Sequence, residues 1–315
     1  MRFSVVVAAF NAAGTLEGAV RSALDQAASD AEVIVSDDGS TDGTLALAHR
    51  LAAEDGRVRV ITAPNGGCSA ARNRGVAEAS GDFVVLLDAD DELAPGFFDA
   101  MARFIEGRPG YDIYSANGTR RFSDGTEEPF FTGPAYAKET SWTLSDLILV
   151  DRIFVMAAIR RELWAEVGGC RTDLRYAEDY DFWLRALASG ARHIYRPEFV
   201  GVAISRAGSK SKNRIPHAEA QIHIFEDLSR RPELSDAQRD QCALKIASLR
   251  TRIERVELEA RLRNGDTVGA RRAYWRVRSA YLSKPLYSAG LALMLLSPRL
   301  YTAAFGARDA RRAGQ

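Results

Sequence analysis

The sequence predicts an α/β fold in which a mostly parallel sheet is flanked by helices and followed by a C-terminal α-helical appendage. Two observations in the first hundred residues indicate the sheet: β-branched runs alternate with helical patterns in the order β-α-β-α-β-α-β, and the runs are continuously apolar. Continuously apolar strands are typical of a parallel sheet that is covered on both faces. A third observation indicates the appendage, because the composition after Pro216 becomes rich in Arg, Glu, Ala and Leu.

The predicted elements follow one another closely. In the first part of the chain, strands and helices alternate over residues 3–10, 14–27, 31–36, 44–55, 58–62, 68–79 and 83–87. Residues 111–131 are expected to form antiparallel strands around a Ser-Asp-Gly turn. Short helices are expected at 159–169, ended by Gly168–Gly169, and at 177–190, ended by Ser189–Gly190.

Composition argues against several classes of protein. The chain of 315 residues has 42 basic and 42 acidic side chains, so no overall charge favours a nucleic acid partner. Three widely spaced cysteines without a Cys-x-x-Cys pair argue against a disulfide framework or a zinc site and fit a reducing cytoplasm. No secretory signal is expected at the N-terminus. The most apolar segment, 286–307, is interrupted by Pro298 and Arg299 before the roughly 20 residues that a membrane-spanning helix needs.

Polar residues gather at three predicted strand ends, which are Phe10–Asn11, Ser36–Thr44 and Asp88–Asp91. Ligands of such sheets bind at the carboxyl ends of the strands, so these three ends are expected to converge. The first turn contains no Gly-x-Gly-x-x-Gly fingerprint and the chain has no P-loop, so the acidic strand end would hold a phosphate only through a divalent cation. Mg²⁺ and Mn²⁺ suit oxygen ligands of this kind.

Four motifs in this order resemble the family 2 glycosyltransferases, which have the GT-A fold. They are VVVAAFNAAGTLEGAVRSALDQ, VIVSDDGSTDGT, NGGCSAARNRGVAEASGDFVVLLDADD and YAEDYDFWLRAL, and they cover roughly the first 210 residues. The resemblance implies a Rossmann-like nucleotide-binding sheet, a nucleotide-diphospho-sugar donor and inverting transfer to an acceptor hydroxyl. It also implies Mn²⁺ or Mg²⁺ held by an Asp-x-Asp motif at Asp88-Ala89-Asp90, with Asp90 on the metal and Asp88 facing the ribose and the metal.

The acidic cluster after the fourth predicted strand also has a structural interpretation. Pro95 is a favoured first residue of a helix and Asp is a favoured N-cap, so one carboxylate of the cluster would serve as a cap. A cap explains only one of the three carboxylates. We therefore assign Asp91 to the structural role and Asp88 and Asp90 to the metal.

The second strand end is expected to recognise the base of the donor. Ser40, Thr41 or Asp42 is predicted to cap the helix that follows. Capping does not require the two consecutive acidic residues Asp37 and Asp38. The resemblance implies that Asp38 accepts a hydrogen bond from the base and that Asp37 supports it. A carboxylate suits the N3–H donor of uracil, so the donor is predicted to be a UDP-sugar.

The first strand end departs from the family pattern, which usually shows a Pro and an aromatic residue before the Asn. This chain has Ala8, Ala9, Phe10 and Asn11. Phe10 can stack on a base, and Ala8 and Asn11 are expected to line the same nucleotide site. The missing proline leaves the base preference open.

Two arginines lie in the first turns of the helix predicted at 68–79. Basic residues there are unfavourable to the helix dipole, which indicates an anion nearby. The resemblance assigns Arg72, in the family's Ala-Arg-Asn segment, to the donor site, whereas Arg74 is expected to be a solvated surface residue. Ser69 is predicted to be the N-cap of this helix.

Residues 111–215 are expected to form the acceptor side. The resemblance implies that Asp179 is the general base, with Glu178 beside it, although acidic residues at a helix start are favourable to the dipole in any case. Arg206 stands where the family often has His, and a guanidinium there would clamp a diphosphate. Packing or ion pairing, rather than contact with a sugar, is expected of Trp142, Phe154, Trp164, Trp183 and Arg185.

The sequence thus predicts a glycosyltransferase domain at 1–215, with a nucleotide-sugar-binding half at 1–110 and an acceptor half at 111–215, and a helical region at 216–315. The predicted function is metal-dependent, inverting, hexosyltransferase-type transfer to a saccharide or lipid-linked acceptor in surface glycan biosynthesis, in the cytoplasm. The alternative is a catalytically silent nucleotide-sugar-binding or assembly module of the same fold. The basic segment 270–284 and the apolar segment 291–296 would either pack as a helical subdomain or lie on the inner face of the cytoplasmic membrane.

Overall fold

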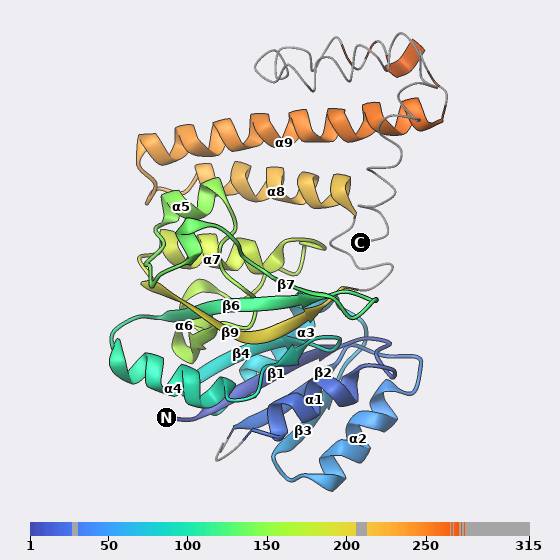
Figure 1. Ribbon diagram of the computed structural model, residues 1–315, viewed down its shortest axis with the longest axis vertical. Coiled ribbons are helices and arrows are strands. Elements are labelled where there is room, and N and C mark those ends of the chain that lie inside the picture. Colours follow the sequence, from blue (N-terminus) through green and yellow to red (C-terminus); the bar gives the residue numbers. More distant parts are fainter. Residues whose placement is uncertain are drawn as a thin grey trace. The chain divides into compact units, whose positions relative to one another are not determined.

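The computed structural model describes residues 1–26, 31–205, 213–264, 266, 268–270, 272 and 274. The chain divides into two compact units (Figure 1). The first unit comprises Met1–Ser209 and Arg230–Gln241, and the second comprises Lys210–Ser229 and Cys242–Gln315.

The first part of unit one alternates between strands and helices, as predicted. Its elements are β1 (Phe3–Ala9), α1 (Leu16–Leu24), β2 (Glu32–Asp37), α2 (Thr44–Glu54), β3 (Val58–Thr62), α3 (Cys68–Ala77) and β4 (Phe83–Asp88). The four strands are parallel and lie in the order β3-β2-β1-β4. Their carboxyl ends therefore lie at one edge of the sheet.

The second part of unit one extends the same sheet in mixed directions. Its elements are β5 (Glu92–Leu93), α4 (Phe97–Gly107), β6 (Ile113–Arg121), β7 (Glu127–Pro129), the 3₁₀ turn η1 (Pro134–Tyr136), α5 (Leu144–Leu149), β8 (Ala158–Arg160), α6 (Arg161–Val167), α7 (Glu178–Ala188) and β9 (His193–Ile204). The sheet order continues from β4 through β8, β6 and β9 to β5, with β7 paired on β6. The antiparallel pairing of β6 and β7 around the Ser-Asp-Gly turn confirms the expected hairpin at 111–131.

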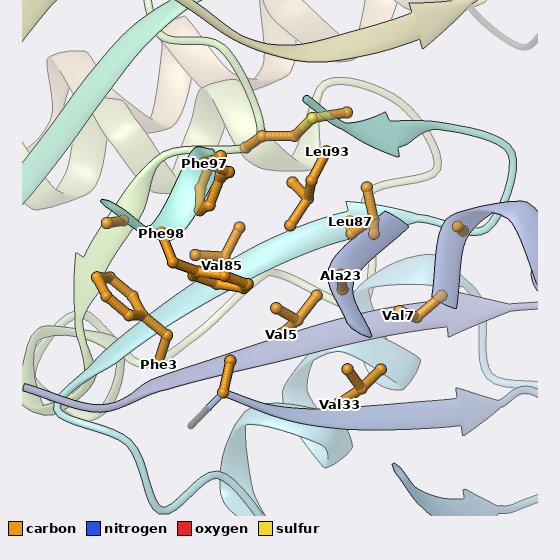
Figure 2. Packing of buried hydrophobic residues seen from close by; sticks show 14 of the residues in the cluster. Phe3, Val5, Val7, Ala23, Val33, Val85, Leu87, Leu93, Phe97 and Phe98 are labelled. Carbon is orange, nitrogen blue, oxygen red and sulfur yellow. The ribbon is translucent and has the colours of Figure 1, made fainter. Parts of the chain in front are cut away.

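One face of the parallel strands packs against α1 and α4 (Figure 2). The buried cluster there includes Val5, Val7, Val33, Val85 and Leu87 from the strands and Ala23, Phe97 and Phe98 from the helices. Each of these valine, leucine and phenylalanine side chains stabilises the fold by roughly 1.5–3 kcal/mol when it is fully buried. This face anchors the strands whose ends carry the candidate site.

On the opposite face, α3 approaches β1 very closely. A Cβ atom at Gly75 would lie 2.3 Å from Cγ1 of Val6, so only glycine allows this contact. Val6 lies between Val5 and Val7 and therefore points to the other side of the sheet. The close approach fixes α3, with Arg72 and Asn73, against the strands.

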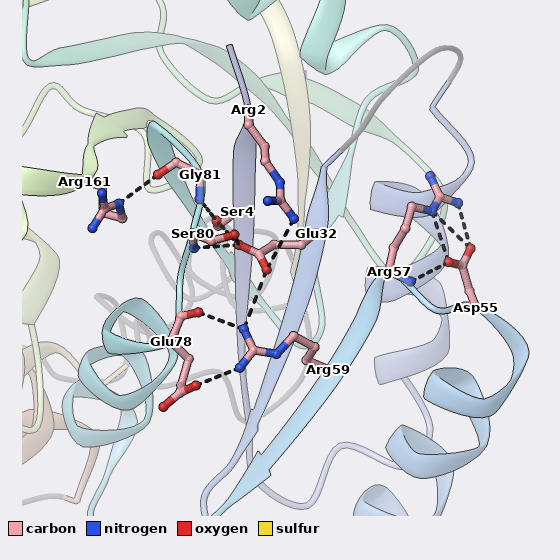
Figure 3. Close-up of polar contacts among 10 residues, drawn as sticks. All are labelled: Arg2, Ser4, Glu32, Asp55, Arg57, Arg59, Glu78, Ser80, Gly81 and Arg161. Carbon is pink, nitrogen blue, oxygen red and sulfur yellow. Dashed lines mark hydrogen bonds and ion pairs between the residues drawn. The ribbon is translucent and has the colours of Figure 1, made fainter.

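The amino ends of the strands are joined by a buried carboxylate (Figure 3). Glu32 accepts hydrogen bonds from Ser4 Oγ at 2.6 Å and from both the N–H and the Oγ of Ser80 at 2.7 Å. Arg2 and Arg59 lie 3.9 and 3.7 Å from its second oxygen. Since Ser80 precedes β4, this carboxylate joins β1, β2 and the start of β4.

Helices form the described part of unit two, as predicted. It contains α8 (Arg214–Ser229) and α9 (Asp236–Arg263) from Cys242 onward. Ion pairs join Arg214 to Glu259 at 3.7 Å and Glu226 to Arg250 at 2.9 Å, so the two helices run antiparallel. Within the described ranges, no helix is both long and apolar enough to cross a membrane. The predicted segment 291–296 lies outside the described residues, as does 270–284 except for three positions.

Candidate active site

The three polar strand ends lie side by side, as expected. Ala8 of β1 is in register with Ser36 of β2 on one side and with Asp88 of β4 on the other, and Ala9 is in register with Asp37. The site is therefore built on the carboxyl edge of a parallel sheet, where ligands of doubly wound folds bind.

Asn11 joins the first two strand ends. Its Oδ1 accepts from the N–H of Thr41 at 2.9 Å, and its own N–H donates to Ser40 Oγ at 3.0 Å. Its φ angle of 50° places it in the left-handed region, which non-glycine residues rarely adopt. Next to it, the Phe10 side chain is 49% exposed. The loop is thus held by Asn11 and presents an aromatic ring to solvent.

Asp37 and Asp38 are both buried, and each orders a loop. Asp37 Oδ2 accepts from the N–H groups of Gly39 and Ser40 at 3.2 Å and from Thr62 Oγ1 at 2.9 Å. Its Oδ1 is buried without a hydrogen-bond partner among the described residues. These bonds shape the turn after β2.

Asp38 fixes the loop before α3. Its Oδ1 accepts from the N–H of Gly66 at 3.0 Å, and its Oδ2 accepts from the N–H of Gly67 at 2.7 Å. Arg74 Nη2 donates to Oδ1 at 2.6 Å, and the Arg74 side chain is only 29% exposed. The expectation that Arg74 is a solvated surface residue is therefore wrong, because it neutralises a buried carboxylate.

The helix starts differ in part from those predicted. Gly67, with a φ of 88°, is the N-cap of α3, and Ser69 lies inside the helix with its Oγ buried and unpartnered among the described residues. The N-cap prediction for Ser69 is therefore wrong. Gly43 is the N-cap of α2, and Asp42 accepts from the N–H of Thr44 at 2.9 Å. Of the three predicted capping residues, Ser40, Thr41 and Asp42, only Asp42 accepts a bond from the first turn of α2 among the hydrogen bonds of the described residues.

Arg72 is buried and joins two acidic motifs. Its Nη2 donates to Asp88 Oδ1 at 2.7 Å, its Nη1 donates to Glu178 Oε1 at 3.1 Å, and its side chain is 4% exposed. Burial acts to lower the pKa of Arg72, but Cys68, Asp88 and Glu178 outweigh it and hold the pKa well above its ordinary value. The anion that the sequence predicted near α3 is thus supplied by the protein's own carboxylates.

Glu178 and Asp179 begin α7. Ala177, just before them, has a φ of 58°, a second non-glycine residue in the left-handed region. Asp179 is half-buried and its Oδ1 accepts from the N–H of Tyr180 at 2.8 Å. Burial raises the pKa of Asp179 above its ordinary value, Glu178 raises it further, and Arg72 opposes both. This carboxylate has a stronger affinity for a proton than an exposed aspartate has.

Asp91 has a structural role, though not the predicted one. Its Oδ1 accepts from the N–H of Ile204 at 2.8 Å and so joins the chain after β4 to the end of β9. The cap of α4 comes instead from Gln26, whose Oε1 accepts from the N–H groups of Gly96 and Phe97 at 2.9 and 3.0 Å. Pro95 precedes the N-cap residue Gly96 rather than opening the helix.

Asp88 and Asp90 provide a small set of oxygen ligands. Asp88 ends β4 with its side chain 37% exposed, and Asp90 is half-buried in the turn that follows. Groups of three or more residues able to hold a metal are absent from the described part of the chain. Mg²⁺ and Mn²⁺ are often held by only one or two carboxylates, with phosphate and water as their other ligands.

Asn73 is a site residue that the sequence did not single out. Its Nδ2 donates to the carbonyl of Cys170 and its Oδ1 accepts from the N–H of Cys170, both at 2.8 Å. This pair of bonds joins α3 to the loop that leads to α7. Asn is a poor residue for the middle of a helix, which is the local signal that could have indicated it.

The aromatic residues of the predicted acceptor side pack as expected. Trp142, Phe154, Trp164 and Trp183 are all buried. Arg185 donates to Asp181 and to the carbonyls of Val167 and Gly169, each at 2.7 Å. Arg206 lies outside the described residues.

Comparison with known sequences identifies the family. The profile described as Glycosyl transferase family 2 matches residues 4–168, which is more than half of the chain. The succinoglycan biosynthesis protein ExoO of Rhizobium meliloti (strain 1021) is 35% identical over 239 residues, covering 72% of this chain and 67% of that protein. The chondroitin synthase of Pasteurella multocida (strain Pm70) is 30% identical over 183 residues, or 58% of this chain, and the chain spans 18% of the length of that relative.

Solved structures share the fold. A crystal structure of S. aureus TarS 1–349 in complex with UDP-GlcNAc matches with a TM-score of 0.65 at 22% identity, covering 79% of this chain and 72% of that one. The mannosyltransferase PcManGT from Pyrobaculum calidifontis, in complex with GDP-Man and Mn²⁺, matches with a TM-score of 0.60 at 19% identity, covering 96% and 87%. These likenesses confirm the predicted GT-A fold. The profile match and the similarity to ExoO show that the chain belongs to glycosyltransferase family 2.

Proposed function

We propose that this chain is a metal-dependent, inverting glycosyltransferase of the hexosyltransferase type, which moves a sugar from a nucleotide-diphospho-sugar to a hydroxyl of a saccharide or lipid-linked acceptor. The observation that carries the proposal is the buried guanidinium of Arg72, bonded to Asp88 at the end of β4 and to Glu178 at the start of α7. It holds the proposed donor-side carboxylate Asp88 and the acidic start of α7 in one site. Sugar transfer needs a group that stabilises charge on the leaving diphosphate and a base that accepts the proton of the acceptor.

A UDP-sugar is the donor that we propose. The exposed ring of Phe10 is available to stack on a base, and Asp38 has one remaining acceptor site, since a carboxylate has about four lone-pair sites and three are used. Ala8 and Asp37 support these strand ends from the sheet. The UDP-GlcNAc bound to TarS, which shares the fold, supports the same choice.

Surface glycan biosynthesis is the setting that we propose. ExoO, to which the chain is 35% identical, is described as a succinoglycan biosynthesis protein. We place the reaction in the cytoplasm, at the inner face of the cytoplasmic membrane if the acceptor is lipid-linked. Arg206, near the end of the first unit, is proposed to contact the diphosphate of the donor.

A divalent cation, Mn²⁺ or Mg²⁺, fits Asp88 and Asp90, the second of which is proposed as its main protein ligand. When bound, the cation would neutralise negative charge on the departing diphosphate. Mn²⁺ is present with GDP-Man in the related PcManGT structure. Arg72 bonds one oxygen of Asp88 and so orients this carboxylate toward the site.

Asp179 is proposed as the base that takes the proton of the acceptor hydroxyl. Its raised pKa makes it a stronger base than an exposed aspartate, which helps it to accept a proton near neutral pH. Glu178 is held by Arg72, so its charge lies at a fixed position beside Asp179. The N–H of Tyr180 bonds one oxygen of Asp179 and orients the other.

The test measures sugar transfer and donor hydrolysis with a panel of UDP-sugars in the presence of Mn²⁺. Asp179→Asn should bind UDP and metal normally, as seen by thermal shift, while transfer falls about 10²–10⁴-fold, the usual contribution of general base catalysis. Asp90→Ala should lose the metal-dependent part of the shift that UDP produces. Glu166→Gln, an exposed acidic residue paired with Arg160, is the control and should leave all readouts unchanged.

The outcomes separate the alternatives. If Asp179→Asn transfers sugar at the wild-type rate, the assigned base is wrong and Glu178 or Asp181 must be tested. If UDP stabilises the protein equally without metal, the assignment of Asp88 and Asp90 is wrong. A wild-type chain that binds UDP-sugars but neither transfers nor hydrolyses any of them would be the silent binding module.

A further inference from the structure

Unit two carries three arginines where the start of α8 faces α9. Arg214 is the first residue of α8, and Arg252 and Arg255 lie one turn apart on α9. Arg214 Nη1 and Arg255 Nε each lie 3.7 Å from the carboxylate of Glu259, one turn further along α9. We call Arg214, Arg252 and Arg255 the arginine cluster.

The arginine cluster carries more positive charge than its neighbours balance. Glu259 is shared between Arg214 and Arg255, and both contacts are longer than a hydrogen bond. Arg252 forms no hydrogen bond or ion pair with any residue that the structure describes. Burial, and the positive charges of Arg214 and Arg255, lower the pKa of Arg252. Among the residues that the structure describes, three guanidinium groups share this one carboxylate, which leaves an excess of two positive charges.

Two further observations indicate that an anion belongs there. Arg255 Nε is buried and has no hydrogen-bond partner in the described part of the chain, and a buried unsatisfied donor is costly. The first turn of α8 contains no acidic residue, so no side chain of that turn compensates the positive end of the helix dipole beside Arg214. An anion bound here would satisfy the dipole, the unpartnered N–H and the excess charge together.

We propose that the arginine cluster binds a phosphate group. A phosphate presents several acceptor oxygens to the planar guanidinium forks of arginine and carries up to two negative charges, which matches the excess. The side chains are accessible, since Arg214 is 43% exposed and Arg255 is 29% exposed. The source is either the headgroup of an anionic lipid or a free phosphate, and this site is independent of the transfer reaction proposed above.

The experiment uses the full chain with two probes. Vesicles of phosphatidylglycerol are compared with vesicles of phosphatidylcholine in a co-sedimentation assay at low salt, and inorganic phosphate is titrated in a thermal-shift assay. Arg252→Gln removes one cluster charge at a position without a described partner, so it should fold normally. The matched control is Arg250→Gln, which removes one charge two residues away, where Arg250 pairs with Glu226 outside the cluster.

We expect Arg252→Gln to weaken binding about fivefold relative to Arg250→Gln, the usual contribution of one basic residue near an anionic surface. The double variant Arg214→Gln/Arg252→Gln should weaken binding about 25-fold at the same salt concentration, if the two contributions add. A difference seen only with phosphatidylglycerol vesicles identifies a lipid headgroup as the source. A difference seen also with inorganic phosphate identifies a site for free phosphate. If Arg252→Gln and Arg250→Gln behave alike with both probes, the proposal is overturned.

Discussion

Arg72 Nη2 lies 2.7 Å from Asp88 Oδ1, so the helix after the Gly66–Gly67 loop is bonded to the end of the central strand β4. The same guanidinium reaches Glu178 with its other terminal nitrogen. A planar fork can hold two carboxylates at once, whereas a lysine ammonium is a point charge on a flexible stem. Arg72 therefore holds the end of β4 and the start of α7 together.

The first prediction concerns the pH dependence of transfer. Because Arg72 lowers the pKa of Asp179, Arg72→Gln should raise that pKa further and move the acidic limb of the kcat profile to higher pH. Arg72→Lys retains the charge, so its acidic limb should shift less, while kcat falls because one ammonium cannot replace both bonds. The measurement is kcat and KM between pH 5 and 9.

Arg74→Gln is the control for this series, since it removes a charge from the same helix at a residue that pairs with Asp38 instead. Its acidic limb should coincide with that of the wild type. Removing one partner from a buried ion pair costs about 3–5 kcal/mol, so Arg72→Gln should also lower Tm. A lower Tm with an unshifted limb would show that Arg72 is structural only.

The second prediction is that Asp179→Asn stabilises the protein while it abolishes most transfer. The folded-state pKa of Asp179 lies above its unfolded value, so this group favours folding at low pH and loses that contribution as pH rises through the folded pKa. At neutral pH the folded chain holds a charge that burial and Glu178 disfavour. Asparagine keeps the shape and the bond from Tyr180 N–H without the charge.

Thermal unfolding of Asp179→Asn and wild type from pH 4 to 8 measures this effect. The variant should have the higher Tm at pH 8, and the difference should shrink as the wild-type carboxyl takes up a proton in acid. A variant less stable than the wild type at pH 8 would contradict the raised pKa. Active sites that keep a charge in an unfavourable environment often gain stability and lose activity when that charge is removed.

The parallel sheet and its strand ends could be predicted because their signals are local. Apolar runs, helical periods and turn residues lie within a few positions of one another, and they placed β1 to β4 and the starts of α3 and α7 within a few residues. The convergence of the strand ends then followed from the geometry of parallel sheets.

The partners within the site could not be predicted, because they are distant in sequence. Arg72 bonds residues 16 and 106 positions away, and Arg74 bonds one 36 positions away. The error at the start of α4 has the same origin, because this helix is capped by Gln26, 70 positions before Gly96. A local pattern can show that a cap or a counter-charge is needed, but it does not identify the distant residue that supplies it.

The third prediction concerns Asp38 and the loop before α3. Asp38→Asn replaces a carboxylate that accepts from two backbone N–H groups and Arg74 with an amide that has only one acceptor oxygen. We expect Tm to fall even without nucleotide, by an amount equivalent to about 1–3 kcal/mol for the donors left unsatisfied. Arg74→Gln should also lower Tm, because it leaves the buried carboxylate of Asp38 without its counter-charge. An unchanged Tm in Asp38→Asn would show that its bonds to the loop contribute little.

The fourth prediction concerns Glu32, at the amino ends of the strands and so at the opposite edge of the sheet from the candidate site. In Glu32→Gln the one acceptor oxygen can still face Ser4 Oγ, Ser80 Oγ and Ser80 N–H, which all donate to the same oxygen now, but these bonds lose their charged acceptor (Figure 3). The amide N–H₂ then lies beside Arg2 and Arg59, which face the second carboxylate oxygen now. The expected loss is about 1–3 kcal/mol of unfolding free energy at pH 7. Transfer per folded molecule should be unchanged, because none of the site residues that the structure describes contacts this network.

The pH dependence of that loss follows from the pKa of Glu32. Burial acts to raise this pKa, but the hydrogen bonds from Ser4 and Ser80 and the charge of Arg2 outweigh it, so the folded-state pKa is lowered. A lowered carboxyl pKa contributes stability that is present above the unfolded pKa and lost as pH falls through the folded pKa. Urea unfolding should therefore show a large difference between wild type and Glu32→Gln at pH 7 and a smaller one at pH 3.5.

Glu78→Gln is the matched control, since Glu78 is 48% exposed and pairs with Arg59, and it should cost no more than about 0.5 kcal/mol. If Glu32→Gln costs as little as Glu78→Gln, the buried carboxylate does not hold the strands together.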